Sequence, residues 1–212
     1  MTDKIDRLDD FDAVIFDLGG VLIDIDLKAT LSKFEALGLC SLPDRISQSH
    51  AGEGLLGRYQ CGLATTPDFI AYVRSQTDRK VTDAELIDAW NAMLGEMDAR
   101  KIALVEKLKA RMPVYLLSNT NAIHWEWARK HAFPHKGFRT EDYFEQTFLS
   151  YEIHLAKPNP AIYQQVLDET DIRPEETLFI DDSPENCSVA QTLFGISTYC
   201  PKPHEDWSHL FQ

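Results

Sequence analysis

The chain has 212 residues, 44 % of them hydrophobic, which is enough for one compact core or for a core with a small inserted domain. It carries 21 Lys and Arg against 34 Asp and Glu, and a net charge of −13 disfavours binding to nucleic acid or to anionic lipid surfaces. No segment reaches the roughly 20 unbroken apolar residues that a membrane-spanning helix needs. The cysteines are widely spaced, which indicates reduced thiols and a cytoplasmic protein: Cys40, Cys61, Cys187 and Cys200.

The first element expected is a strand over residues 11–17. Residues 13–16 are all apolar, as in a strand buried on both faces of a parallel sheet. The strand ends at Asp17, and Gly19 and Gly20 follow, so the chain must turn sharply there.

A helical pattern follows, from about Leu27 to Leu94. Apolar residues recur at helical spacing over 27–37, and helix-start signatures precede helices that begin near Thr66 and Thr82. The last of these helices is expected to extend to Leu94. No strand is predicted in this stretch, which indicates a small all-helical insertion. We expect residues 1–23 and 98–212 to form the core domain and residues 24–97 the inserted domain.

Strands and helices alternate in the rest of the chain. The pattern predicts helices over 99–111, 121–132, 159–169 and 184–193, and strands over 113–118, 146–150, 177–181 and 195–199. This alternation predicts an α/β fold with a doubly wound, Rossmann-like parallel sheet. In such sheets ligands bind at the carboxyl ends of the strands.

Polar residues follow three of these strands. The first strand ends in Asp17, another in Ser118, Asn119 and Thr120, and a third in the Asp181–Asp182–Ser183 segment. Lys157 stands just before a predicted helix. Carboxylates and carbonyls suit Mg²⁺, whereas a hydroxyl, backbone N–H groups and a lysine suit the oxygens of a phosphoryl group. A carboxylate directed at phosphorus can act as the nucleophile.

The chain resembles the haloacid dehalogenase (HAD) superfamily in four short motifs. They are the segment 14–22 around Asp17, the segment 116–119 that ends in Ser118 and Asn119, Lys157 with the proline that follows it, and the segment 179–186 around Asp182. One such motif is weak evidence, but four in order, each after an expected strand, are specific. Within the superfamily the chain resembles the bacterial α-glucose-1-phosphate phosphatase subgroup, in the segments 16–19 with 24–26, 117–121 with His124, and 157–158 with 162–163.

The resemblance implies a Mg²⁺-dependent phosphatase with a helical cap, acting on a small phosphate ester, in particular a sugar phosphate, through an aspartyl-phosphate on Asp17. It assigns catalytic roles to Asp17, Ser118 and Lys157, and substrate binding to Ser118, Asn119 and Lys157. The metal would be held by Asp17, the Gly19 carbonyl and Asp182, with Asp181 and Asn186 supporting these ligands from behind.

Gly19 departs from the pattern of most phosphatases in the superfamily, which carry a second Asp there as general acid and base. General acid–base catalysis is typically worth 10²–10⁴-fold, so its loss favours esters with good leaving groups, such as sugar 1-phosphates and aryl phosphates. Two alternatives stay open. One is a weakly active binding or regulatory protein of the same fold, and the other is a 2-haloacid dehalogenase, which would not need the acidic pair at Asp181 and Asp182.

Residues outside these motifs allow competing interpretations. Asp24 and Asp26 either hinge the cap or are solvated connectors. The glycine-rich segment 52–57 is expected to be a loop, with Glu53 and Arg58 as candidates for substrate selection. His124 is interpreted as a local hydrogen-bonding residue rather than a metal ligand, because no second His or Cys stands at ligand spacing. The sequence does not determine the oligomeric state.

Overall fold

The structure, a computed structural model, describes residues 11–40, 51–133 and 139–211. A sheet of five parallel strands forms the centre, in the order β5-β4-β1-β6-β7. The strands are β1 (Ala13–Phe16), β4 (Val114–Ser118), β5 (Gln146–Leu149), β6 (Thr177–Ile180) and β7 (Ser197–Tyr199).

The central strand β1 pairs with a neighbour on each side. Val14 lies opposite Val114 of β4 and Leu178 of β6, and all four residues of β1 are buried. Each of the five strands lies within or close to the segment that the apolar runs predict. The register sets the carboxyl ends of β1, β4 and β6 side by side.

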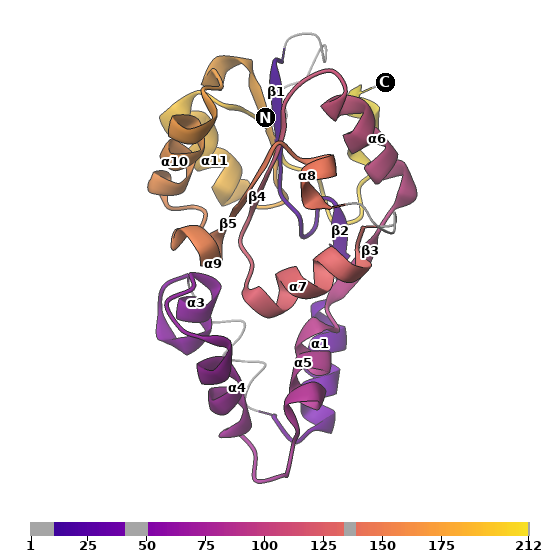
Figure 1. Cartoon of the computed structure of the whole chain (residues 1–212), viewed down its shortest axis with the longest axis vertical. Coiled ribbons are helices and arrows are strands. Elements are labelled where there is room, and N and C mark those ends of the chain that lie inside the picture. The colour runs from indigo at the N-terminus through magenta and orange to yellow at the C-terminus, as the bar shows by residue number, and fades with distance from the viewer. Residues whose placement is uncertain (1–10, 41–50, 134–138, 212) are drawn as a thin grey trace.

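Helices cover both faces of the sheet (Figure 1). On one face α6 and α7 pack with the C-terminal turn η3, and on the other α10 and α11 pack together. The bounds of these and the short elements around them are α6 (Ala99–Lys109), α7 (Ala122–His131), α8 (Thr140–Tyr143), α9 (Ser150–Ile153), α10 (Pro160–Thr170), η2 (Pro174–Glu176), α11 (Pro184–Phe194) and η3 (Trp207–Phe211). The predicted doubly wound α/β fold is confirmed.

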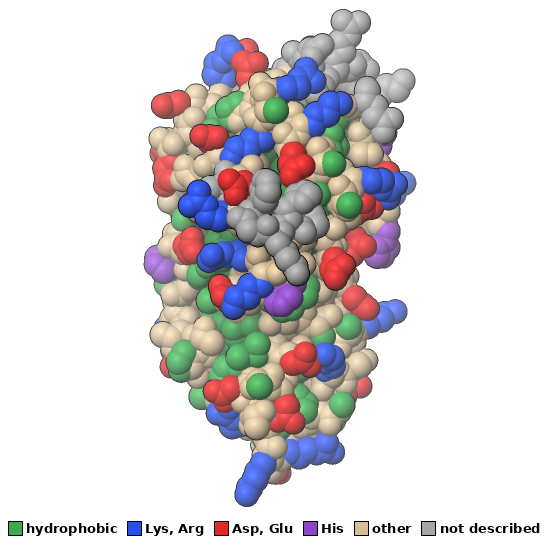
Figure 2. All heavy atoms as spheres, turned by 45° about the vertical axis from the view of Figure 1, so that its right-hand side comes forward, with side chains coloured by type: hydrophobic (Ala, Val, Ile, Leu, Met, Phe, Trp, Pro, Cys, Tyr) green, Lys and Arg blue, Asp and Glu red, His purple; other side chains and the backbone are tan. Residues whose placement is uncertain are grey.

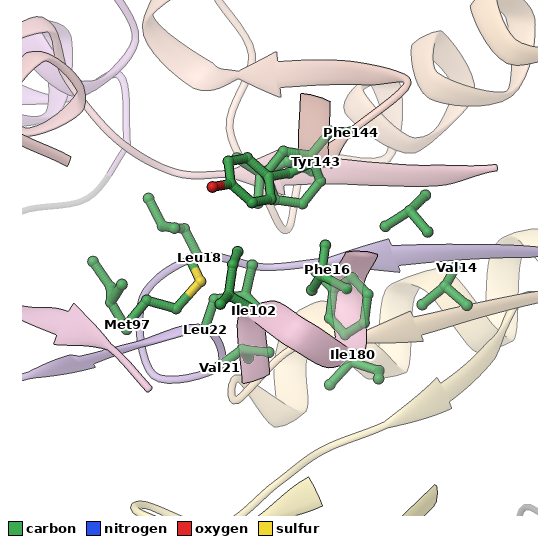
Figure 3. Packing of buried hydrophobic residues seen from close by; sticks show 14 of the residues in the cluster. Val14, Phe16, Leu18, Val21, Leu22, Met97, Ile102, Tyr143, Phe144 and Ile180 are labelled. Carbon is green, nitrogen blue, oxygen red and sulfur yellow. The ribbon is translucent and has the colours of Figure 1, made fainter. Parts of the chain in front are cut away.

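The first face holds the larger apolar cluster. Figure 3 shows Phe16 and Ile180 from neighbouring strands packed in the same cluster as Ile102 of α6, with Tyr143 and Phe144 above them in this view. The Trp207 indole, fully buried, lies 5.1 Å from the Phe16 ring and donates to the Val21 carbonyl. The sheet that carries the strand ends is therefore held rigidly from both sides.

A second group of helices lies below the sheet in Figure 1. It contains α1 (Leu27–Ala36), α3 (Gly54–Gln60), α4 (Thr66–Arg74) and α5 (Asp83–Asn91). Capping boxes at Thr65 and Thr82 fix the starts of α4 and α5. These helices have an apolar cluster of their own, which includes Phe34, Phe69 and Trp90. The expected helical insertion is thus present, and we refer to it as the cap.

Two expectations for this region are wrong. The helix that begins at Thr82 stops at Asn91, and Leu94–Met97 forms a strand, β3, which pairs antiparallel with β2 (Ile23–Ile25). This two-stranded ribbon connects the cap to the α/β domain. The glycine-rich segment is also not a loop from Gly54 onward, because Gly54–Gln60 forms α3.

The structure also bears on the surface charge and on the possibility of a membrane-spanning helix. On the face in Figure 2, acidic and basic side chains are interspersed, so the net charge of −13 is not gathered into one patch there. Among the described residues, no helix combines the length and apolar character that crossing a bilayer would require.

Candidate active site

Four separate segments bring polar side chains to one edge of the sheet. Asp17 follows β1, Ser118 ends β4, and Asp181 and Asp182 follow β6. Because β1 lies between β4 and β6, these residues converge. Lys157 reaches the same place from the segment before α10, whose start is capped by the side chain of Asn159.

Lys157 is the centre of this cluster, with a side chain only 1 % exposed. Its Nζ lies 3.0 Å from Asp17 Oδ1, 2.6 Å from Asp181 Oδ2 and 2.7 Å from the Leu117 carbonyl. An ammonium group has three hydrogens, so these three acceptors satisfy it completely. Lys157 is therefore fixed, and it fixes Asp17 in turn.

The two carboxylates and the ammonium group influence one another. Burial raises the pKa of Asp17 to about 7, and the positive charge of Lys157 opposes this rise. Burial alone would lower the pKa of Lys157, but the charges of Asp17 and Asp181 outweigh it and hold that pKa above its usual value. Lys157 is consequently the counter-charge that opposes the rise in the pKa of this buried carboxyl and favours its ionised form.

Asp181 and Asp182 point in different directions. Asp181 is fully buried: its oxygens accept from Lys157, from the Ser183 amide at 2.8 Å, and from Asn186 Nδ2 at 3.0 and 3.1 Å. Asp182 is exposed and lies on the wall of a cavity. Burial and the neighbouring Asp181 raise the pKa of Asp182. Asp182 can therefore bind a ligand, whereas the oxygens of Asp181 already accept hydrogen bonds from the protein.

The cluster fits a divalent cation. One oxygen from each of Asp17, Asp181 and Asp182 lies within 4.8 Å of the others, and carboxylate oxygens are the ligands that Mg²⁺ prefers. Gly20 makes the approach of Asp182 possible: it has a φ of +75°, and a Cβ there would lie 2.2 Å from Asp182 Oδ2. Any side chain at position 20 would push Asp182 away from Asp17.

The cavity in front of these residues has a volume of about 380 Å³ and lies between the strand ends and the cap. Five of the predicted site residues line it: Asp17, Gly19, Ser118, Asn119 and Asp182. The other three, Lys157, Asp181 and Asn186, are buried behind this wall. The Asn119 side chain is also occupied, since its amide donates to the Lys157 carbonyl at 2.8 Å and its oxygen accepts from the Lys157 amide at 2.9 Å.

The remaining candidates either lie outside the cavity wall or, in the case of His124, have protein partners. Glu53 and Arg58 are exposed and are absent from the cavity wall, and Arg58 donates to the Leu63 carbonyl instead. Asp26 caps α1, and the Asp24 side chain is exposed. His124 lines the cavity, but its ring nitrogens contact Asn121 and the Trp90 carbonyl, both at 3.1 Å, which confirms its local hydrogen-bonding role.

The cap supplies cavity residues that the sequence analysis did not identify. Most are apolar, and they come from the β2–β3 ribbon, from α1, α3 and α5, and from the segment that joins α5 to β3: Ile25, Leu27, Leu56, Tyr59, Gln60, Trp90, Met93 and Leu94. No sequence motif identifies these residues, because their spacing is that of the apolar residues in any amphipathic helix.

Comparison with known proteins agrees with this geometry. The sequence model of the haloacid dehalogenase-like hydrolases matches residues 11–192. The chain belongs to this family. The resemblance seen in the four motifs is thereby confirmed.

Three relatives illustrate the similarity. A D-ribitol-5-phosphate phosphatase of Bacteroides thetaiotaomicron is 32 % identical over 194 residues, which are 92 % of this chain and 93 % of the relative. The structure of a wild-type HAD family enzyme of the same species, in complex with magnesium and inorganic phosphate, superposes with a TM-score of 0.89 at 43 % identity, covering 95 % of this chain and 100 % of the other. A HAD-like family hydrolase of Porphyromonas gingivalis has a TM-score of 0.83 at 29 % identity and covers 93 % and 94 %.

Proposed function

We propose that the protein is a Mg²⁺-dependent phosphatase that hydrolyses a small monoester of phosphate with a sugar or polyol, through a covalent intermediate on Asp17. The observation that carries this proposal is the position of Asp17. Its carboxylate lies on the cavity wall, 3.0 Å from the buried Lys157 and beside the exposed Asp182. A fixed carboxylate with a counter-charge behind it and an open cavity in front of it is arranged as a nucleophile.

The reaction would take two steps. An Asp17 oxygen forms a bond to phosphorus while the bond between phosphorus and the ester oxygen breaks, and the alcohol leaves with the electron pair of that bond. Water then attacks the phosphorus of the acyl phosphate, which releases inorganic phosphate and restores the carboxylate. Lys157 favours the ionised form of Asp17 and orients it in both steps, and the Ser118 hydroxyl on the cavity wall donates to a phosphoryl oxygen.

Asp17, the Gly19 carbonyl and Asp182 would hold Mg²⁺, and the bound ion would neutralise charge on the phosphoryl oxygens. Asp181 is committed to Lys157, Ser183 and Asn186, so it supports the loop of Asp182 rather than reaching the ion. The magnesium and phosphate in the structure of the Bacteroides enzyme support this assignment.

The relatives favour a polyol or sugar phosphate as the substrate class. The ribitol-5-phosphate phosphatase acts on a phosphate carried by a primary alcohol, whereas the subgroup resemblance and Gly19 favour a 1-phosphate. Both are phosphates on polyhydroxylated carbon skeletons. The cytoplasmic location, the absence of nucleic-acid partners and the domain boundaries at 23/24 and 97/98 belong to the same proposal.

The test is phosphate release from p-nitrophenyl phosphate, ribitol 5-phosphate, glucose 1-phosphate and glucose 6-phosphate. We expect turnover with Mg²⁺, loss of turnover with EDTA, and recovery when Mg²⁺ is restored. Chloride release from 2-chloropropionate without metal would instead support the dehalogenase. The absence of any turnover would favour the binding or regulatory protein.

A further inference from the structure

Most hydrogen-bonding side chains that the cap brings to the cavity are already paired. The Tyr59 hydroxyl lies 3.0 Å from Thr66 Oγ1 and accepts from the Ile123 amide at 3.3 Å. The Trp90 indole N–H donates to Asn121 Oδ1 at 3.4 Å. Gln60 differs, because its half-buried side chain lines the cavity and its amide has no hydrogen-bond partner among the described residues.

Thr120 is the corresponding residue on the core side. It is 6 % exposed and lies on the same cavity wall, two residues after Ser118. In the part of the chain that the structure describes, its hydroxyl likewise has no partner. Ser118 faces the phosphoryl group in the proposed reaction, so a polar group at Thr120 is close to the phosphate end of a bound ester.

Ser150 ties these two residues together. Its Oγ accepts from the Thr120 amide at 2.9 Å and lies 2.7 Å from the Gln60 carbonyl, to which it donates. It also lies 3.0 Å from the Thr120 carbonyl. The next cap residue, Cys61, is held in the same way by His154 Nδ1, 2.9 Å from its carbonyl. Figure 1 shows the consequence: the end of α3 lies against α9, which begins at Ser150.

From these contacts we propose that Gln60 and Thr120 form the subsite for a hydroxyl group on the alcohol portion of the substrate. The carboxamide of Gln60 and the hydroxyl of Thr120 can each both donate and accept a hydrogen bond. This pair therefore matches a neutral hydroxyl of the substrate better than a charged group. The surrounding Ile25, Leu56 and Met93 provide apolar surface for the carbon skeleton. This inference rests on the proposed phosphatase function and deepens it, since it requires a hydroxylated leaving group.

The subsite is rigid in its backbone and free only in its side chains. Because Ser150 bonds both to the carbonyl of Gln60 and to the backbone of Thr120, the cap and the core are already joined at this point. A site that is built to pair a hydroxyl discriminates against an analogue that lacks it, because the polar groups of the site are then left without that partner. Arg58, which the sequence suggested for a role in substrate selection, does not line the cavity and donates to the Leu63 carbonyl.

The experiment compares ribitol 5-phosphate with pentyl phosphate, which has the same chain length and no hydroxyls. We expect the wild-type protein to favour ribitol 5-phosphate in kcat/KM, and Gln60→Leu to reduce this preference about tenfold, the size of one hydrogen bond. Thr120→Val should reduce it as well. The matched control is Gln76→Leu, also in the cap, whose amide donates to Ser75 and Tyr72 and which is absent from the cavity wall. It should keep the wild-type preference within twofold.

Each other outcome overturns the inference in a recognisable way. An unchanged preference in Gln60→Leu, or equal losses on both esters, would reduce Gln60 to a structural residue. A wild-type protein that releases phosphate from p-nitrophenyl phosphate but does not favour ribitol 5-phosphate would refute the subsite and leave the phosphatase standing. Failure on p-nitrophenyl phosphate too would refute the proposed function itself.

Discussion

The side chain of Ile25 covers Gly19, two residues after the proposed nucleophile. A Cβ on Gly19 would lie 3.2 Å from Ile25 Cγ1 and 3.3 Å from Ile25 Cδ1, closer than ordinary packing allows. Ile25 comes from the ribbon that connects the cap to the core, and it also lines the cavity. The position where most phosphatases of the superfamily carry an acidic side chain is thus tightly bordered by hydrocarbon, which must shift to admit a side chain.

This contact predicts that Gly19→Asp destabilises the protein. Inserting a side chain into filled space typically costs about 1–3 kcal/mol. Shortening the neighbour should relieve the strain, so Gly19→Asp with Ile25→Ala should be more stable than the sum of the two single effects. Urea denaturation of the four proteins measures the coupling. Strict additivity would mean that Ile25 moves aside without cost.

Asp17→Asn tests the nucleophile. The substitution keeps the shape of the side chain and removes the negative charge, so the covalent intermediate cannot form in the usual way. We expect phosphate release to fall at least about a thousandfold, as for the loss of a nucleophile that the rest of the site cannot replace. Far-UV circular dichroism should be unchanged, and a variant that keeps a tenth of the wild-type rate would contradict the mechanism.

Lys157→Met tests the counter-charge. Lys157 is buried between Asp17 and Asp181, and its removal leaves two buried carboxylates without their cation. Breaking a buried ion pair in this way costs about 3–5 kcal/mol. Urea unfolding should show a loss of that order. The surface substitution Lys33→Met, which removes the exposed pair with Asp88, is the control and should change the unfolding free energy by less than about 1 kcal/mol.

The core of the fold could be predicted because its strands are buried on both faces. Val14, Leu116 and Leu178 belong to continuous apolar runs, and each run ends at a polar residue that the parallel arrangement carries to one edge. The convergence of Asp17, Ser118 and Asp182 therefore follows from strand order. The sequence does not reveal that Lys157 is buried behind Asp17, because burial depends on which side chains cover it.

The cap was harder to predict for two physical reasons. The ribbon joins Ile23 to Met97, a contact between distant segments that are too short to show alternation. Helix α3 forms despite its glycines, because Tyr59 stacks on Phe69 at 4.6 Å and tertiary packing outweighs propensity. Gln60 carries no signal at all, since a glutamine becomes a candidate ligand only once its neighbours are known to be paired.

His124 predicts an acid-sensitive stability. Burial lowers its pKa from 6.5 to about 4, and its hydrogen bond to the Trp90 carbonyl offsets this only in part. Between pH 6.5 and 4 the unfolded chain binds a proton that the folded protein does not, so stability falls as the pH falls through this window. The loss from this residue is about 2.5 kcal/mol by pH 4.5. His124→Gln has no group that titrates at this position. The loss of unfolding free energy between pH 7 and pH 4.5 should therefore be smaller in the variant than in the wild type, by about 2.5 kcal/mol.

The last prediction concerns the leaving group. With Ile25 over Gly19 and no acid at that position, the ester oxygen must leave largely unprotonated or take a proton from water or from the substrate itself. Anomeric and aryl oxygens leave more readily than primary alcohols, because their conjugate acids are stronger. We therefore expect kcat/KM to be higher for glucose 1-phosphate than for glucose 6-phosphate. Contacts in the cap oppose this effect, since well-placed hydrogen bonds can outweigh leaving-group chemistry.

The variants with Gly19→Asp separate the two effects. In Gly19→Asp with Ile25→Ala the new carboxyl has room to act as a general acid. It should help the poorer leaving group, the primary alcohol of the 6-phosphate, most. The preference for the 1-phosphate should therefore decrease, by up to the 10²–10⁴-fold that such catalysis provides. Because Ile25 also lines the cavity, Ile25→Ala alone is the reference against which the preference of the double variant is measured. A preference that stays constant in the double variant would assign the selectivity to the cap, whereas a wild-type preference for the 6-phosphate would show that binding outweighs leaving-group chemistry from the start.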